Sequence, residues 1–120
     1  PWGCRIGDLI DDLTFSQDGS RIGVVTKDGE AWSLAVDGNR WNNTFDMAWR
    51  PVFSPDSNHV AAKVEKNGLY TYAVDDRLWN KECDQVWEPV FSPDSKRILL
   101  KYRDDGRYCR RIVPVTELAG

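Results

Sequence analysis

The stretch FSPDSKRI, residues 91–98, has two near-copies earlier in this chain of 120 residues, FSQDGSRI at 15–22 and FSPDSNHV at 53–60. Both steps are 38 residues long, and the three stretches align without a gap. Self-similarity at a fixed period of about 20–50 residues is typical of solenoids, propellers and arrays. The sequence therefore predicts three repeats that together span nearly the whole chain.

The similarity continues on both sides of this stretch. Upstream, MAWRPVF (47–53) aligns with QVWEPVF (85–91), and downstream WSLAVDGNRW (32–41) aligns with YTYAVDDRLW (70–79). We interpret residues 1–120 as one domain with repeats at 9–46, 47–84 and 85–120. Residues 2–8 align with 40–46, the end of a repeat, so we expect residues 1–8 to form an overhanging fourth strand.

Each repeat reads as four antiparallel β-strands. In the second repeat, Pro55-Asp56 predicts a turn, because Pro fixes φ near −65° and Asp bonds to the nearby backbone. Asn67-Gly68 predicts a type I′ hairpin, since both residues tolerate positive φ, and Asp75-Asp76 predicts the next turn. We find no helical periodicity and expect an all-β fold. Four strands in about 40 residues are typical of a propeller blade, and we expect the Phe before each FSPD-like turn to pack between blades.

The FSPD turn, followed by a strand such as KRILL (96–100) or HVAAK (59–63), resembles the TolB-type Pro-Asp β-propeller repeat. The resemblance covers essentially the whole chain and implies a propeller. It does not imply one function, because this repeat occurs in binding scaffolds, peptidase domains and accessory subunits. The six Trp residues also make the chain similar to the tryptophan-rich accessory subunit of transmembrane redox complexes of sulfate-reducing bacteria, which implies a role in electron transport.

Three blades do not close a ring, since propellers typically have four to eight. The third repeat lacks a fourth strand, and the overhang of a second chain supplies one. We therefore predict a head-to-tail homodimer with six blades, whereas a trimer would have nine. The alternative is that the chain is part of a longer protein or a processed product, as its start at Pro1 suggests.

The cysteines bear on this closure. If the hairpin turns at Asp75-Asp76, residues whose numbers sum to 151 face each other. Carried to the seam between two chains, this register places Cys4 opposite Cys109, which suggests a disulfide. The alternative is an ordinary pair of small buried residues, because a shift of one residue would separate them. Cys83 is left unpaired.

Charge and hydropathy exclude several classes of partner. Sixteen basic and nineteen acidic residues give a net charge of −3, spread without long runs, so we expect no nucleic-acid partner. No apolar stretch approaches the roughly 18 residues of a membrane span, so we expect no direct membrane insertion. The compartment stays open.

We find no catalytic signature and predict no cofactor and no metal site. The single histidine, His59, reads as a solvated turn residue, and the G-x-S-x-G motif of a hydrolase nucleophile is absent. The glycines form no phosphate-binding loop, and no Cys/His cluster has metal-ligand spacing. We therefore expect a protein that is not an enzyme.

The positions at which the repeats disagree suggest a binding site. Equivalent positions 11, 49 and 87 read Asp, Trp and Trp, and positions 12, 50 and 88 read Asp, Arg and Glu. Scaffold positions should agree between repeats, whereas positions that contact an asymmetric ligand need not. We predict that these residues form the rim of the propeller channel and bind a polypeptide or a small polar ligand. The rim residues are Asp11, Asp12, Trp49, Arg50, Trp87 and Glu88.

Two alternatives remain for this rim. Its charges could pair with one another at the surface, which would contribute little stability. Its Trp residues could serve the packing between blades.

We expect a non-enzymatic β-propeller that acts as a protein-interaction scaffold, as an accessory subunit of a membrane-associated electron-transfer complex. The alternative is a hydrolase or lyase that uses the channel carboxylates with Ca²⁺ or Mg²⁺.

Overall fold

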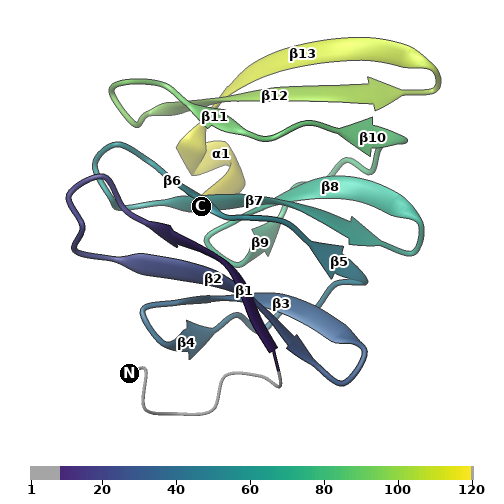
Figure 1. Ribbon diagram of the computed structural model, residues 1–120. Coiled ribbons are helices and arrows are strands. Elements are labelled where there is room, and N and C mark those ends of the chain that lie inside the picture. Colours follow the sequence, from purple (N-terminus) through teal and green to yellow (C-terminus); the bar gives the residue numbers. More distant parts are fainter. Residues whose placement is uncertain (1–8, 120) are drawn as a thin grey trace.

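Three antiparallel sheets lie one above another in the computed structural model, which describes residues 9–119 (Figure 1). The fold is all β apart from one short helix at its end, so the prediction of an all-β fold is confirmed.

The first sheet has the strand order β1-β2-β3-β4. Its strands are β1 (Leu9–Phe15), β2 (Ile22–Asp28), β3 (Ala31–Val36) and β4 (Asn39–Arg40). The second sheet has the order β5-β7-β8-β9, and β6 also pairs with β7. Its strands are β5 (Met47–Ala48), β6 (Val52–Phe53), β7 (Val60–Lys66), β8 (Leu69–Val74) and β9 (Arg77–Leu78).

In the third sheet β12 pairs with β10, β11 and β13. The strands are β10 (Gln85–Val86), β11 (Val90–Phe91), β12 (Arg97–Asp104) and β13 (Arg107–Pro114), and the helix α1 (Val115–Ala119) follows them. We call the first strand of each sheet its leading strand: β1 in the first sheet, β5 with β6 in the second, and β10 with β11 in the third. The leading strands span 9–15, 47–53 and 85–91, so they recur every 38 residues.

The FSPD-like turns share one hydrogen-bond pattern. In the second sheet, the Asp56 carboxylate accepts the backbone N–H of Asn58 at 3.0 Å and the hydroxyl of Ser54 at 2.6 Å. Asp18 and Asp94 make the equivalent bonds in the other two turns. The predicted role of Asp in this turn is therefore confirmed, and the Ser before it adds a second bond.

The residue after the turn Asp adopts positive φ in all three sheets: 75° at Gly19, 65° at Ser57 and 64° at Ser95. Gly takes this conformation without steric cost, whereas Ser does not. The two Ser hydroxyls make bonds between sheets instead. Ser57 donates to the Asp18 carboxylate at 3.0 Å, and Ser95 accepts the backbone N–H of Asp56 at 2.9 Å. The turns therefore also link each sheet to the next.

The core lies between the sheets. Val25 and Leu34 of the first sheet pack against Val64 of the second in one cluster. Tyr72 of the second sheet packs against Leu100 of the third in a larger cluster. Burial of such side chains is the main favourable term in folding, so each sheet is stabilised by its neighbour.

Both hairpin turns predicted in the second sheet are confirmed. Asn67 and Gly68 have φ of 55° and 81°, and Asp75 and Asp76 have 51° and 65°. These turns join β7 to β8 and β8 to β9.

The end of the chain differs from the prediction, because residues 115–119 form a helix where no helix was expected. In the first two repeats, Asp37-Gly38 and Asp75-Asp76 take positive φ and turn the chain into a fourth strand. The third repeat has Val113-Pro114 at these positions. Neither a β-branched residue nor Pro tolerates positive φ, so the turn is not made. Strand β13 therefore continues to Pro114, and α1 follows.

Phe15 differs from its two repeat equivalents within the single chain. Phe91 is buried between the second and third sheets, as expected, and Phe53 is half-buried. Phe15 is exposed, because no sheet of the described chain precedes the first one.

The register expected after Asp75-Asp76 holds only next to the turn. Val74 pairs with Arg77 and Ala73 with Leu78, so the numbers sum to 151. Further from the turn, however, Tyr70 pairs with Cys83.

The segment that runs back along β8 after the Asp75-Asp76 turn therefore contains two more residues than the simple register requires. As a result, residue 71 does not pair with residue 80. This register was the basis for placing Cys4 opposite Cys109. Cys4 lies outside the described residues and Cys109 is half-buried, so the disulfide stays a prediction.

Candidate functional site

All three leading strands are irregular at the same place. In the second sheet Ala48 pairs with Val64 and Val52 with Ala61, so three residues of the leading strand oppose two of β7. The first and third sheets show the same one-residue shift, between 11 and 14 and between 86 and 90. A β-bulge of this kind re-aims side chains and is common beside functional sites. Each bulge contains one of the positions 12, 50 and 88, at which the repeats disagree.

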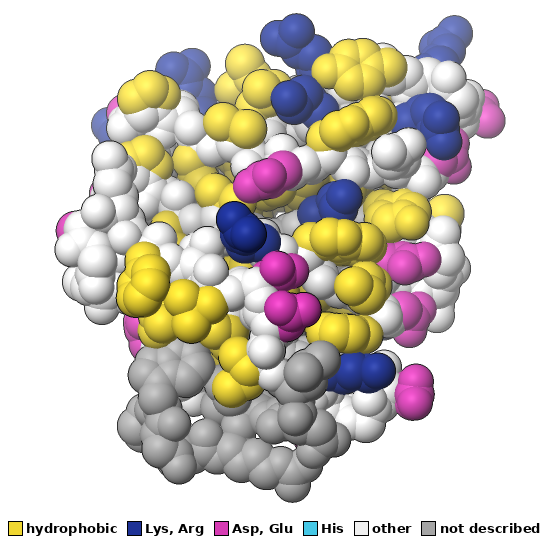
Figure 2. Space-filling model, viewed as in Figure 1, with side chains coloured by type: hydrophobic (Ala, Val, Ile, Leu, Met, Phe, Trp, Pro, Cys, Tyr) yellow, Lys and Arg dark blue, Asp and Glu magenta, His cyan; other side chains and the backbone are white. Residues whose placement is uncertain are grey.

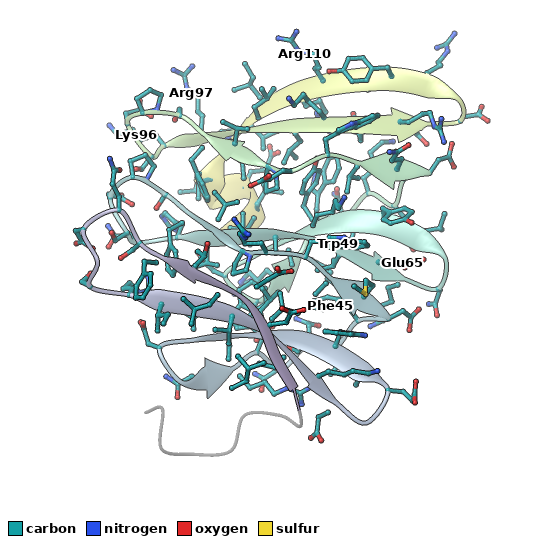
Figure 3. The ribbon with its side chains drawn as sticks, viewed as in Figure 1. Phe45, Trp49, Glu65, Lys96, Arg97 and Arg110 are labelled. Atoms are coloured by element: carbon teal, nitrogen blue, oxygen red, sulfur yellow. The ribbon has the colours of Figure 1, made fainter. Side chains whose placement is uncertain are left out.

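The three bulges line a pocket of about 240 Å³, which we call the bulge pocket. Each sheet contributes to it, although the residues lie far apart in the sequence. The lining residues are Asp12, Trp49, Arg50, Lys63, Glu88 and Pro89. Figure 2 shows acidic and basic side chains next to one another over the middle of the face that carries the leading strands, and Figure 3 labels Trp49 on that face.

Four of the six predicted rim residues thus line one pocket. Trp87 lies beside a neighbouring groove of about 580 Å³, which shares Glu88 and Pro89 with the bulge pocket. Asp11 is next to the pocket in the chain, and its carboxylate accepts the backbone N–H of Asp12 at 2.9 Å.

The charged side chains of the bulge pocket do not form ion pairs with one another. Within residues 9–119, no ion pair of 4.0 Å or less joins Asp12, Arg50 or Glu88 to another side chain. This differs from the alternative of mutually paired surface charges. The three side chains can therefore bind groups of a partner.

The two rim tryptophans have aromatic neighbours on their own sheets. The Trp49 ring lies 5.9 Å from the Tyr70 ring, and the Lys63 ammonium lies 4.5 Å from the Trp49 ring centre, within cation–π range. Trp87 meets Tyr108 edge to face at 5.6 Å. These contacts hold the tryptophans in place while one part of each ring stays accessible.

Lys63 and Pro89 also line the pocket but were not predicted from the sequence. Lys63 lies on β7, beside the leading strand, and its repeat equivalent on β12 is Lys101. This recurrence of a Lys within mainly apolar strands was a signal in the sequence.

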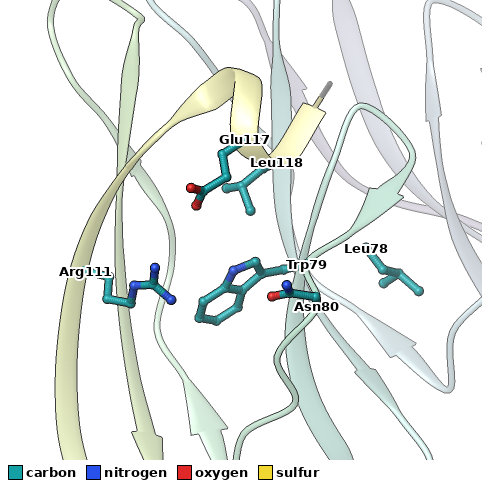
Figure 4. A pocket seen from close by; sticks show the side chains of 6 residues that line it. All are labelled: Leu78, Trp79, Asn80, Arg111, Glu117 and Leu118. Carbon is teal, nitrogen blue, oxygen red and sulfur yellow. The ribbon is translucent and has the colours of Figure 1, made fainter.

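A second pocket, of about 340 Å³, lies where α1 replaces the fourth strand of the third sheet (Figure 4). In Figure 4 the Arg111 guanidinium and the Glu117 carboxylate both point toward the space above the Trp79 ring. Trp79 itself is buried against Tyr72 and Tyr102. No predicted rim residue lines this pocket.

His59 has a structural role. Its Nδ1 lies 2.7 Å from a carboxylate oxygen of Asp75. At the equivalent place in the first sheet, Arg21 bonds to Asp37 at 2.9 Å. In each sheet the pair joins the residue just before β2 or β7 to the turn that follows β3 or β8. His59 therefore has the same structural role as Arg21 and is not a solvated residue.

Among residues 9–119, no group of three or more His, Cys, Asp or Glu side chains is placed to hold a metal ion. Burial raises the pKa of the Cys83 thiol to about 11. None of the helices in the described part of the chain has the length and apolar character required to span a membrane.

No family model matches the chain, and no curated protein is significantly similar to it.

Proposed function

We propose that the chain is a segment of a β-propeller, with its three sheets as blades, and that it acts as a non-enzymatic protein-interaction scaffold. The bulge pocket is the observation that carries this proposal. Residues from three repeats converge there at the positions where the repeats disagree. Propellers typically have four to eight blades, so the three blades form half of a six-bladed ring that a second chain completes.

The chemistry of the pocket suits a polypeptide partner. Arg50 offers a planar group that binds carboxylates, and Asp12 with Glu88 offers acceptors for cations or N–H groups. The adjoining groove adds apolar surface, with Trp87 and Val90 among its lining residues. A short segment that carries charged and apolar side chains together would fill both. Exposed aromatic and Arg residues are also enriched at the centres of protein interfaces.

The resemblance to redox-complex accessory subunits favours one setting for this scaffold. The proposed partner is then a subunit of a membrane-associated electron-transfer complex, with the present chain as an accessory subunit.

A binding experiment tests the pocket. Peptides are selected against the wild-type protein from a random-peptide display library, and the binding of one synthetic peptide is measured by calorimetry. The double variant Arg50→Met with Trp87→Ala removes the guanidinium and the exposed ring. We expect at least a tenfold loss of affinity, about 1.4 kcal/mol, without a lower melting temperature.

A matched control carries Arg77→Met with Leu69→Ala. Arg77 lies on β9, at the edge of the second sheet opposite its leading strand, and Leu69 is 39% exposed against 38% for Trp87. This control should bind the peptide as the wild type does. Equal affinity of both double variants would contradict the proposed function.

A further inference from the structure

The two ends of the stack expose apolar positions that are buried elsewhere in the same repeat. On the first sheet, Ile10 is 51% exposed, whereas its equivalents Ala48 and Val86 are each 1% exposed. Phe15 is 64% exposed, against 9% for its equivalent Phe91. In the second and third sheets these positions pack against the preceding sheet.

At the other end of the stack, the third sheet also exposes an apolar side chain that is buried in the preceding repeat. Ile112 is 63% exposed on its outer face, whereas its equivalent Val74 is 1% exposed because the third sheet covers it. Tyr108, on the same strand β13, is also exposed, at 57%. Figure 2 shows hydrophobic side chains among Lys and Arg over this sheet, and Figure 3 shows Arg97 and Arg110 pointing away from the other sheets. The stack therefore ends in two open faces, each of which corresponds to one side of an interface already present inside it.

Charge indicates what covers the open face of the third sheet. Inside the stack, Lys63 of the second sheet lines the bulge pocket together with Glu88 of the third. In the third sheet the repeat equivalent of Lys63 is Lys101, which lies on the open face of that sheet. The residue that it would meet is the equivalent of Glu88 on a following sheet. On the first sheet of this chain that equivalent is Asp12, so the sign of the charge is again complementary.

A second position repeats this match. The Tyr72 hydroxyl reaches the bulge of the third sheet, where it lies 2.6 Å from the carbonyl oxygen of Trp87 and accepts the N–H of Lys101 at 3.2 Å. The equivalent of Tyr72 on the open face is Arg110. The bulge that it would meet on a first sheet contains Asp11 and Asp12. A guanidinium there can bond to the bulge carbonyl and to these carboxylates.

We propose that the open face of the third sheet binds the open face of the first sheet in a second copy of this chain. Because the contact is head to tail, two copies make it twice and close a ring of six sheets. The contact buries Ile112 and Tyr108 of one copy against Ile10 and Phe15 of the other, with Lys101 and Arg110 facing Asp11 and Asp12. This inference rests on the propeller arrangement of the proposed function and shares Asp12 with the bulge pocket, but its test measures molecular mass with no peptide present.

A charge-swap experiment tests the contact. One variant carries Lys101→Glu with Arg110→Glu, and the other carries Asp11→Lys with Asp12→Lys. Alone, each variant would place like charges at both contacts, so both should be monomers of about 13.8 kDa by light scattering. In an equimolar mixture, one contact has the native charges and the other has them exchanged, so the mixture should form a heterodimer of twice that mass.

Recovery on mixing separates lost assembly from lost folding, because a misfolded variant would not assemble with the other. A mixture that stays monomeric, or a single variant that remains a dimer, would overturn the inference. Peptide binding to the Arg50→Met, Trp87→Ala pair is measured separately, so a failure of the bulge pocket is distinguishable from a failure of this contact.

Discussion

Removal of the Tyr72 hydroxyl tests how the second and third sheets are joined. Tyr72 is fully buried, and burial holds the pKa of its hydroxyl well above the usual range. The bulge at 87–89 leaves the Lys101 N–H without a partner on the leading strand, and the Tyr72 hydroxyl accepts it at 3.2 Å. The carbonyl oxygen of Lys101 is less dependent on Tyr72, since it also accepts the Trp87 N–H at 2.9 Å.

In Tyr72→Phe the ring still fills its place, but the Lys101 N–H and the Trp87 carbonyl lose the hydroxyl. A buried polar group left unsatisfied costs about 1–3 kcal/mol. The chain of 120 residues lies between domains of roughly 60–100 residues, for which each kcal/mol lowers the melting temperature by about 4–8 °C, and domains of roughly 150–250 residues, for which the figure is about 2–4 °C. We therefore expect a clear loss of stability in urea and thermal unfolding, measured at a fixed protein concentration.

Tyr108→Phe is the matched control. Tyr108 is 57% exposed, so the same loss of one oxygen should change stability by less than about 0.5 kcal/mol. If Tyr72→Phe were no less stable than Tyr108→Phe, the hydroxyl would not join the two sheets.

Three further predictions concern acid, thiols and one loop. Hydrogen bonds from Ser20 and Ser54 hold the pKa of the turn carboxyls Asp18 and Asp56, respectively, below the ordinary 3.8, so their contribution to stability is complete above that pH and is lost as the pH falls through the lowered values. Unfolding followed by circular dichroism should accordingly show a stability loss beginning near pH 4, which Asp56→Asn reduces. Cys83, with its pKa of about 11, should react with a thiol reagent at pH 8 at least tenfold more slowly than half-buried Cys109; equal rates would contradict its burial. Asp76→Ala removes the acceptor of three hydrogen bonds from residues 42 and 43, so we expect a loss of about 1–3 kcal/mol in urea unfolding, whereas a change below about 0.5 kcal/mol would show that these bonds contribute little.

The regular part of the fold could be predicted because it rests on local rules that recur three times. The Asn67-Gly68 and Asp75-Asp76 turns follow from which residues tolerate positive φ, and the turn aspartates follow from their short, bonding side chains. The absence of a fourth strand in the third repeat was predicted, and Val113-Pro114 gives its local reason, because neither residue tolerates positive φ. The helix at 115–119 was not predicted, because five residues are too few to show a helical period.

The register after the Asp75-Asp76 turn could not be predicted in the same way. The two extra residues between Trp79 and Cys83 are accommodated by side-chain bonds, such as that of Thr71 to the Lys81 carbonyl. These bonds depend on packing between sheets, which a pattern along one strand does not contain. The candidate site could be predicted only in part. Disagreement between repeats singled out Asp12, Arg50 and Glu88, but only the three aligned bulges show that they line one pocket.

The molecular mass of the wild-type chain in solution tests the account most directly. We expect a second copy of the chain to cover the apolar faces at the two ends of the stack. Light scattering coupled to size exclusion should therefore give twice the 13.8 kDa of the chain at micromolar concentration. A folded, stable species of 13.8 kDa would contradict it.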